Sequence, residues 1–449
     1  MKKLISRFPL VVVGLVAATG PMAWAACSTY SAQTNTGTSQ IAAGGPVACV
    51  IPNLYGAGGL TLPNISFAGV FQNSSLANLT PLSSAIGTQL GLLPLASSAS
   101  GFTFTFDPVA GAYTRSSETY GPILAERAET IGRKKLLVAV SYQRYEFNTI
   151  DNFDVRNFPT VLSQTVTSFE ASKDVITTTT GADLKINQST LFATYGAAER
   201  LDLSVAIPIE NVSLTATSNA TIFRVSNTLT NYFDPTNTST GLRKTFVNSS
   251  TASGIGDVTL RAKGTVWRND MVAIALAVDL RLPTGDAANY LGSGAIGFKP
   301  FVIASLRKGR VSPHVNIGYQ KNGKSILAGD ITKDQKASLP SQFIWTVGAD
   351  ARILKRLTLA LDILGQRVFD APRLESAIFT TVPSNFITTS QNLPNVTKVT
   401  ESYDAINGSA GLKVNLGGNF LATANLLIKL NDGGLRANLS PLFGVSYTF

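Results

Sequence analysis

Apolar and polar residues alternate strictly along two stretches of the chain. In LDLSVAIPIE (201–210) every odd-numbered position is aliphatic, and in VAIALAVDLRL (272–282) every even-numbered position is. Successive side chains of a β-strand point to opposite faces, so each stretch predicts a strand with one wholly aliphatic face. The opposite face carries small or charged residues, which fits a polar barrel interior better than a freely solvated surface. The aliphatic face would then contact lipid.

Strands of this kind recur from residue 131 to residue 449, and the number that we predict is even, as in bacterial single-chain barrels. The twelve expected strands are 134–147, 182–196, 200–216, 254–267, 271–283, 294–307, 310–320, 339–353, 356–368, 402–416, 419–430 and 436–449. Tight turns alternate with longer connections, of which the longest are Ser/Thr/Asn-rich loops at 149–181, 217–253 and 369–401. Short periplasmic turns and long outer loops are typical of membrane barrels. The fold class that we predict is therefore all-β, a transmembrane antiparallel β-barrel of about twelve strands in the bacterial outer membrane.

The last expected strand carries aromatic or apolar residues at every second position, ending with the terminal residue. These residues are Phe443, Val445, Tyr447 and Phe449. Aromatic rings favour the interface between membrane and water. A terminal Phe after alternating apolar residues resembles the signal that the barrel assembly machinery reads in outer-membrane proteins. We therefore expect outer-membrane lipid and that machinery as partners.

The N-terminus has the pattern of a secretory signal peptide over residues 1–25. Lys2, Lys3 and Arg7 precede an apolar run at 8–20, and Ala-Trp-Ala follows at 23–25 as a cleavage site. The whole chain has a formal net charge of +10, which by itself favours nucleic acid as a partner. Export argues against nucleic acid, as does the absence of Lys/Arg clusters interleaved with aromatic residues.

Residues 26–130 differ from the rest of the chain in composition and show little regular alternation of apolar and polar residues. They are rich in Ser, Gly, Ala, Asn and Thr, and the stretch 74–96 predicts one or two short helices, interrupted at Pro81. Twelve strands enclose more space than their own side chains fill. The segment therefore either plugs the lumen or forms a periplasmic domain that binds a partner, and we favour the plug.

The chain has two cysteines, Cys27 and Cys49, and both lie in this segment. Export to an oxidising compartment predicts a disulfide that restrains the segment. Two thiols are too few for a metal site, because the single histidine of the chain is far away in sequence. We expect neither a metal nor a cofactor.

Charged residues on the inward-facing side of the expected strands are candidates for the lumen wall. They are Asp257, Arg261, Lys263, Asp279, Arg281, Asp350 and Arg352. Buried charges of both signs normally pair, because an unpaired one is costly. The set predicts either a structural ladder that braces the barrel or a zone that selects or gates a passage.

Ser312, His314 and Asn316 share one face of an expected strand, and the same residue types serve the outer-membrane phospholipase. That enzyme acts on its lipid-facing surface, whereas this face also carries Gln320 and points inward. Residues two apart on a strand are separated by about 6–7 Å, too far for a direct hydrogen bond. We therefore expect no catalytic site and no enzyme.

Several stretches resemble one known family. GIGDVTLRAKG (254–264), AVDLRLPTGD (277–286), LGSGAIGFKP (291–300) and PHVNIGY (313–319) are similar to the outer-membrane transporter-like family linked to meta-pathway phenol degradation. The resemblance covers roughly residues 132–449, and that family is itself similar to long-chain fatty-acid and aromatic-hydrocarbon channels. Compared with the fatty-acid channels, this chain has fewer expected strands and a longer, unlike N-terminal segment.

The resemblance implies passive uptake of small hydrophobic compounds, aromatic or fatty-acid-like, through a plugged barrel. Two other functions stay open at this point. A barrel that transports nothing could serve adhesion or surface structure through its long loops, and a general water-filled porin would need an open lumen.

Overall fold

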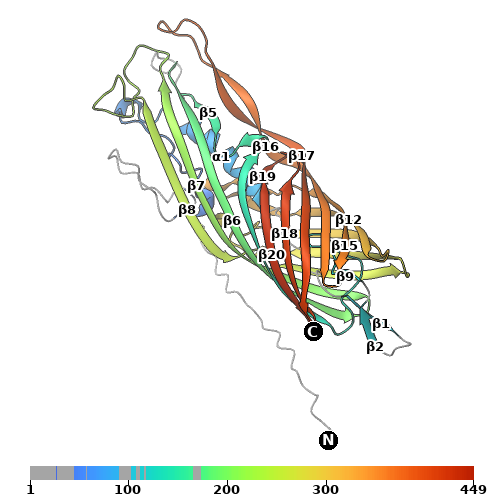
Figure 1. Cartoon of the computed structure of the whole chain (residues 1–449). Helices are drawn as coiled ribbons and strands as arrows, with labels where there is room; N and C mark the ends of the chain where they lie inside the picture. The colour runs from blue at the N-terminus through green and yellow to red at the C-terminus, as the bar shows by residue number, and fades with distance from the viewer. Residues whose placement is uncertain are drawn as a thin grey trace.

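The structure is a computed structural model, and it describes residue 27 and residues 45–56, 58–90, 103–107, 112–115, 118–164 and 173–449. The expected signal peptide, residues 1–25, lies outside the described residues. Within the described part, twelve antiparallel strands form a closed barrel (Figure 1). Closure comes from the first strand of the wall, which pairs with the last through Gly444↔Ser141 and with the second through Gln143↔Gln188. The predicted fold class is confirmed.

The wall strands alternate in direction around the barrel. They are β3 (Leu136–Ile150), β6 (Val175–Ala198), β7 (Leu201–Phe223), β9 (Thr259–Arg268), β10 (Val272–Arg281), β11 (Gly297–Leu306), β12 (Val311–Asn322), β15 (Gln342–Leu354), β16 (Leu357–Thr380), β17 (Asn392–Gly417), β18 (Phe420–Lys429) and β20 (Leu439–Thr448). Each overlaps one of the twelve predicted strands. On this side of β7, β9 pairs with residues 201–206, and β8 (Arg243–Ile255) pairs with residues 209–221 farther along the strand.

Shorter elements lie at the two ends of the barrel or inside it. They are η2 (Val47–Cys49), η3 (Ile65–Phe67), α1 (Gln72–Leu90), β1 (Phe104–Asp107), β2 (Ala112–Arg115), β4 (Phe153–Asp154), β5 (Phe158–Leu162), η5 (Ala287–Asn289), β13 (Lys324–Asp330), η6 (Ile331–Lys333), β14 (Gln335–Ser338) and β19 (Leu435–Ala437). Among the described residues, none of the helices combines the length and the hydropathy that a membrane-crossing helix needs.

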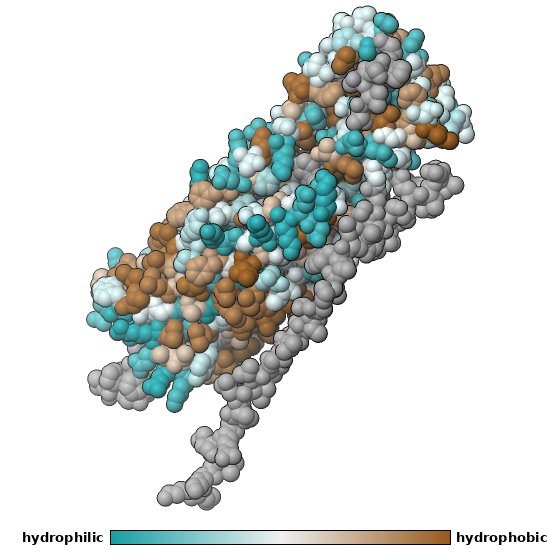
Figure 2. All heavy atoms as spheres, turned by 180° about the vertical axis from the view of Figure 1, so that it is seen from behind, coloured by the Kyte–Doolittle hydropathy of each residue, from teal (hydrophilic) through white to brown (hydrophobic). Residues whose placement is uncertain are grey.

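The lower part of the wall carries an apolar outer belt. Outward side chains such as Leu203, Leu276, Val347 and Phe443 are 47–55% exposed although they are aliphatic or aromatic. In Figure 2 apolar residues gather on the lower half of the barrel, and polar ones are more frequent above it. Exposure of so much apolar surface is favourable only against lipid, so the belt marks the outer-membrane span.

In several strands the apolar residues change from the outer face to the inner face where the strand leaves the belt. In β7 the outward residue Ile209 is apolar and 53% exposed, whereas above it the inward residues Val212 and Leu214 are apolar and fully buried. The pairing of β7 with β6 runs through this point without a shift, so the strand keeps its geometry and only the sequence pattern changes phase. The reason is solvent: lipid surrounds the lower wall and water surrounds the upper wall, so apolar side chains turn inward there.

The three long loops predicted from the sequence are largely wrong. Large parts of 149–181, 217–253 and 369–401, expected as loops, are strands that extend the wall beyond the membrane: β5, β8 and the outer ends of β6, β7, β16 and β17. Their many Thr, Ser and Asn residues suggest loops, but alternate ones face water while their neighbours pack inward. β-Branched Thr is well suited to such half-exposed strands.

The N-terminal segment fills the upper lumen. Residues of η2 and α1 pack in one buried cluster with inward residues of the wall, including Phe147, Leu184 and Leu214. The phenol of Tyr55 is 2.8 Å from the hydroxyl of Ser218 on β7, and Asn78 donates to Val161 O at 3.0 Å. This arrangement agrees with the predicted plug. The division of the mature chain at residue 130 stays a prediction.

Helix α1 runs without a break through Pro81, so the predicted interruption there is wrong. A proline inside a helix removes one hydrogen bond and normally kinks or ends it. Here the helix lies inside the barrel, with Leu79, Ala85 and Ile86 buried. Tertiary packing of this kind outweighs local propensity.

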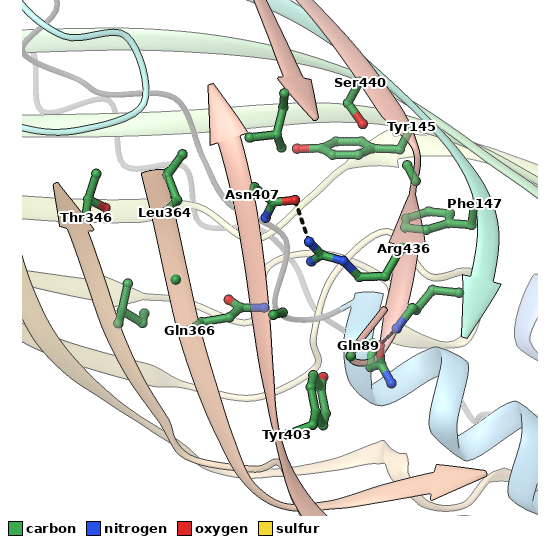
Figure 3. A pocket seen from close by; sticks show the side chains of 17 residues that line it. Gln89, Tyr145, Phe147, Thr346, Leu364, Gln366, Tyr403, Asn407, Arg436 and Ser440 are labelled. Carbon is green, nitrogen blue, oxygen red and sulfur yellow. Dashed lines mark hydrogen bonds between the residues drawn. The ribbon is translucent and has the colours of Figure 1, made fainter. Parts of the chain in front are cut away.

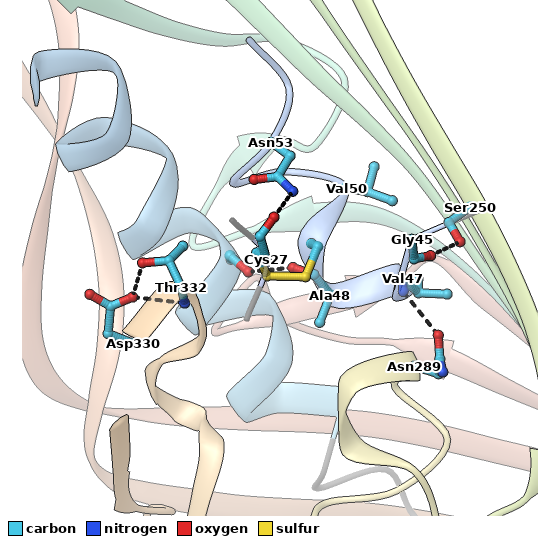
Figure 4. The surroundings of a disulfide bond; sticks show 12 residues. Cys27, Gly45, Val47, Ala48, Val50, Asn53, Ser250, Asn289, Asp330 and Thr332 are labelled. Carbon is cyan, nitrogen blue, oxygen red and sulfur yellow. Dashed lines mark hydrogen bonds between the residues drawn. A yellow bond between two sulfur atoms is a disulfide. The ribbon is translucent and has the colours of Figure 1, made fainter. Parts of the chain in front are cut away.

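The predicted disulfide is confirmed. Cys27 and Cys49 are bonded, with Cα atoms 5.4 Å apart (Figure 4). Close to it, Asn53 Nδ2 donates to Cys27 O at 2.7 Å, and Val47 N donates to Asn289 Oδ1 at 3.1 Å. The bond thus ties the start of the described chain to η2, which itself contacts the loop between β10 and β11.

Candidate functional site in the barrel lumen

A strap of extended chain crosses the lower lumen, and we define it as residues 119–131. No residue of the strap belongs to a helix or strand, yet nearly all of it is buried. Its sequence, TYGPILAERAETI, combines Gly121 and Pro122 with four charged or hydroxyl residues near its end. A buried segment without secondary structure must find other partners for its backbone groups.

Wall side chains supply those partners. Tyr120 N donates to Thr358 Oγ1 at 3.2 Å, and Ala128 N donates to Ser305 Oγ at 2.9 Å. Two lysines donate to strap carbonyls: Lys413 to Tyr120 O and Pro122 O, and Lys263 to Arg127 O and Glu129 O. The strap is therefore held across the lumen by side-chain hydrogen bonds from several strands.

The same strap carries charges that pair with the predicted wall charges. Glu126 contacts Arg261, and the Lys263 ammonium lies 3.8 Å from the Glu126 carboxylate. Arg127 lies 3.4 Å from Asp350. The charged strap residues were not among the predicted lumen charges. Their signal was the density of charge at 118–129, because residues 26–117 carry only two charged side chains.

The remaining predicted charges pair mostly along the wall. Arg261 donates to Asp279 on the neighbouring strand, with Nη2 and Oδ2 2.7 Å apart, and Arg281 lies 3.7 Å from Asp257. Arg352 pairs with Glu118, just before the strap, at 2.7 Å. The pattern also includes residues that the prediction left out: Asp202, Lys299, Arg307, Asp362 and Lys413.

His314 lies between two buried carboxylates. Its Nε2 is 2.6 Å from Asp362 Oδ1, and its Nδ1 is 3.5 Å from Asp350 Oδ1. The first contact spans three adjacent strands, because Gly348 on β15 stands in register between His314 on β12 and Asp362 on β16. A Cβ atom on Gly348 would lie 2.0 Å from Asp362 Oδ1, so only glycine leaves room for the pair.

The side chains of Ser312, His314 and Asn316 are not hydrogen-bonded to one another, although His314 Nδ1 lies 3.3 Å from the backbone carbonyl oxygen of Ser312. Ser312 Oγ is 3.4 Å from Thr119 Oγ1, His314 contacts the two carboxylates, and Asn316 binds the backbone of Glu126. Two of the three side chains thus hold the strap. The arrangement braces the lumen and offers no nucleophile with an adjacent base. Among the described residues, no group of three His, Cys, Asp or Glu side chains is placed to hold a metal.

A pocket of about 90 Å³ lies in the lumen between the plug and the strap (Figure 3). Gln89, at the end of α1, lines its upper side, and its wall includes Tyr145 and Phe147 of β3.

Leu364 and Leu427 line the pocket toward the strap. Leu427 belongs to a buried cluster that contains Ile123 and Leu124 of the strap, and Leu364 packs against that cluster. The pocket therefore has the plug helix at one end and the strap at the other.

Polar side chains also line the pocket, among them Gln366, Asn407 and Arg436. Arg436 of β19 enters the lumen from the loop between β18 and β20, and its Nη2 donates to Asn407 Oδ1 at 2.6 Å and to Ile406 O at 2.7 Å. Among the seventeen lining residues Arg436 is the only charged one. Arg436 is the first residue of the predicted strand 436–449, on the face opposite Phe443, but it was not among the predicted lumen charges; in the structure it lies in the separate short strand β19.

Comparison with protein-family models finds a match over residues 160–348. The matching model is described as "Putative MetA-pathway of phenol degradation". The resemblance to the phenol-degradation family is confirmed. The matched residues include five of the seven predicted lumen charges, from Asp257 to Arg281, and the paired strands that hold them. No curated protein sequence matches this chain.

Solved structures of other outer-membrane barrels are similar to this chain. The COG4313 outer membrane channel from Pseudomonas putida F1 is 13% identical, and the match covers 72% of this chain and 98% of that one with a TM-score of 0.41. The toluene transporter TbuX from Ralstonia pickettii is 14% identical, with 78% and 99% covered and a TM-score of 0.28. A FadL homologue from Pseudomonas aeruginosa is 10% identical, with 70% and 89% covered and a TM-score of 0.30.

Proposed function

We propose that this protein is an outer-membrane channel that admits small hydrophobic compounds without energy input. The observation that carries the proposal is the pocket inside the barrel, because aromatic and aliphatic side chains line most of it between plug and strap. Concave sites with a mainly apolar lining and a few placed polar groups are typical of small-molecule binding. The family match and the name of the toluene transporter agree with such a substrate class.

The contents of the lumen favour this function over a general porin. Plug residues occupy the upper lumen, and the strap occupies the lower lumen. A water-filled pore would need both elements to be displaced. The strap is held by side-chain hydrogen bonds and not by strand pairing, so it is the element whose displacement would open the lower lumen.

Uptake by whole cells tests the proposal. Cells that produce the full chain in the outer membrane are expected to accumulate labelled toluene faster than cells without it. Ala405→Phe places a ring in the pocket, since Ala405 is 2% exposed and lines it, and should abolish the difference. Ala422→Phe, on the lipid face of β18, is the matched control and should keep wild-type uptake.

The folded state of each variant is checked by the heat-dependent shift of the barrel in electrophoresis. Equal uptake with and without the folded wild-type chain would refute the channel and favour a structural or adhesive barrel. A steady, large ion conductance of the full chain in a planar bilayer would favour the general porin instead.

A further inference from the structure

Two buried hydrogen-bond donors of the pocket have no partner. Arg436 Nε and Gln89 Nε2 each lack an acceptor among the described residues, and the two side chains are 7% and 6% exposed. Both residues line the pocket, and they reach it from the same side (Figure 3). Leaving a buried donor unpaired is costly, and the cost is larger for a charged group.

The Arg436 guanidinium also forms no ion pair within 4.0 Å, although Asp432 attracts it from a longer distance. Its other contacts are a carbonyl and an amide, Ile406 O and Asn407 Oδ1. The nearby acid Asp432 pairs with Lys429, and Asp404 pairs with Arg367 on the outer surface. Across the described residues, no carboxylate comes within 4.0 Å of Arg436. The pocket thus presents one positive charge, without a direct ion pair, in a largely apolar lining.

The rest of the pocket fits an apolar body. Tyr145 and Phe147 lie on one wall with nearly parallel rings, and Leu364 and Leu427 lie toward the strap. The pocket volume of about 90 Å³ is of the same order as the ~150 Å³ cavity that accepts benzene in another protein. A single ring or a short aliphatic chain matches this scale.

We propose that the pocket binds a small monocarboxylate with an apolar body, of the class of aromatic carboxylates. One carboxylate oxygen accepts from Arg436 Nε and the other from Gln89 Nε2, while the ring lies against Phe147 and Leu364. A carboxylate supplies two planar acceptors and one negative charge, which matches these two donors and the single guanidinium. The inference rests on the proposed function, because it names the class of compound that the channel takes.

Binding of benzoate and of its neutral isostere benzamide tests the inference. Isothermal titration of the full chain in nanodiscs is expected to show benzoate binding at least tenfold tighter than benzamide. Gln89→Glu is the decisive variant: its carboxylate keeps the acceptor for Leu435 N but places a negative charge in the pocket. Benzoate affinity should fall at least tenfold in this variant, and benzamide affinity should stay within about twofold.

Arg436→Gln should likewise lower benzoate affinity at least tenfold, whereas Arg367→Gln on the outer surface should leave it unchanged. Equal affinity of the wild type for benzoate and benzamide, or benzoate binding that Gln89→Glu does not weaken, would overturn the inference. Toluene uptake separates this failure from failure of the channel itself. Uptake without preferential benzoate binding refutes only the carboxylate site, and absence of uptake refutes the proposed function.

Discussion

The side-chain amide of Asn316 forms two hydrogen bonds with the backbone of Glu126. Asn316 Oδ1 accepts from Glu126 N at 2.7 Å, and Asn316 Nδ2 donates to Glu126 O at 2.9 Å. One wall side chain thus supplies the hydrogen-bond partners for both the N–H and the C=O of one strap residue, as the backbone of a neighbouring strand would. Closure of the lower lumen therefore depends on individual side chains, and single substitutions can loosen it.

The double substitution Asn316→Leu with Lys413→Met should open the lower lumen. It removes four hydrogen bonds to the strap, two from each side chain, and separates no ion pair within 4.0 Å. Each buried carbonyl or amide left without a partner costs about 1–3 kcal/mol. Single-channel recording in a planar bilayer should show more frequent or larger openings than the wild type. Asn425→Leu, which removes a lumen contact to Ser409 instead, is the control and should behave as the wild type. A double variant as silent as the wild type would show that other contacts suffice to hold the strap.

An arginine on the outer face of β7 should be costly within the belt and tolerated above it. Leu203 lies in the belt and Thr215 lies on the same face above the polarity reversal. Leu203→Arg is expected to lower the free energy of unfolding by about 2–4 kcal/mol and Thr215→Arg by about 0–1 kcal/mol. Urea unfolding in lipid vesicles measures both. Similar losses for the two variants would place the membrane boundary elsewhere.

Removal of the disulfide should loosen the plug while the barrel stays folded. Cys27 and Cys49 are 22 residues apart, and closing a loop of that size contributes about 3 kcal/mol in the chain-entropy account. In the double variant Cys27→Ser with Cys49→Ser, chymotrypsin should cut the N-terminal segment faster at aromatic residues that are buried in the intact plug, such as Tyr55 and Phe71. The heat-dependent electrophoretic shift of the barrel should stay unchanged. Reduction of the wild type with dithiothreitol serves as the control and should reproduce the same pattern; unchanged proteolysis would mean that packing alone holds the plug.

Docking of the plug should weaken at high pH through Tyr290. Burial raises the pKa of Tyr290 to about 12, against a smaller opposing effect of its contact with the Ser83 hydroxyl 3.4 Å away. The pKa of Tyr290 in the folded protein lies above the ordinary value of about 10. The contribution of the buried, un-ionised phenol to the stability of the docked plug is therefore complete below pH 10 and is lost as pH rises toward 12. The loss amounts to about 2–3 kcal/mol over this range. Hydrogen exchange of α1 between pH 9 and 11, corrected for the intrinsic rate, measures the first half of this loss, about 1.4 kcal/mol by pH 11. Tyr290→Phe should show a shallower dependence, and identical curves would exclude this tyrosine as the cause.

Substitution of the terminal residue should impair assembly of the barrel. Phe449 is 62% exposed at the lower rim, where its ring lies 4.6 Å from that of Tyr447. If Phe443, Val445, Tyr447 and Phe449 form the signal for the assembly machinery, Phe449→Ser should reduce the amount of chain in the outer membrane several-fold. Leu439→Ser, at the opposite end of the same strand and 49% exposed, is the control. Equal membrane levels of both variants would exclude a special role for the terminal residue.

Much of the fold could be predicted from the sequence, because local alternation encodes it. Leu203 and Ser204 point to opposite faces whatever the rest of the chain does, and a repeat of such pairs in twelve segments predicts the barrel and its lipid-facing side. The same argument places Asp279 and Arg261 on the inner face of neighbouring strands. The pairing of Cys27 with Cys49 followed from their number and from export. The outer extensions were missed because the alternation changes phase near Ile209, where lipid gives way to water.

By itself, then, the sequence determined the twelve-stranded wall, its lipid-facing surface and the disulfide. Only the tertiary structure decided what fills the lumen, since those contacts join residues far apart in the chain. Lys413 reaches the carbonyl of Tyr120 293 residues away, and Gln89 reaches Leu435 across 346 residues. No local periodicity specifies such pairs; they depend on the register in which the barrel closes and on the path of the strap through it. The physical reason is that backbone geometry sets the wall, whereas the site is assembled by side chains that meet only when the wall is closed.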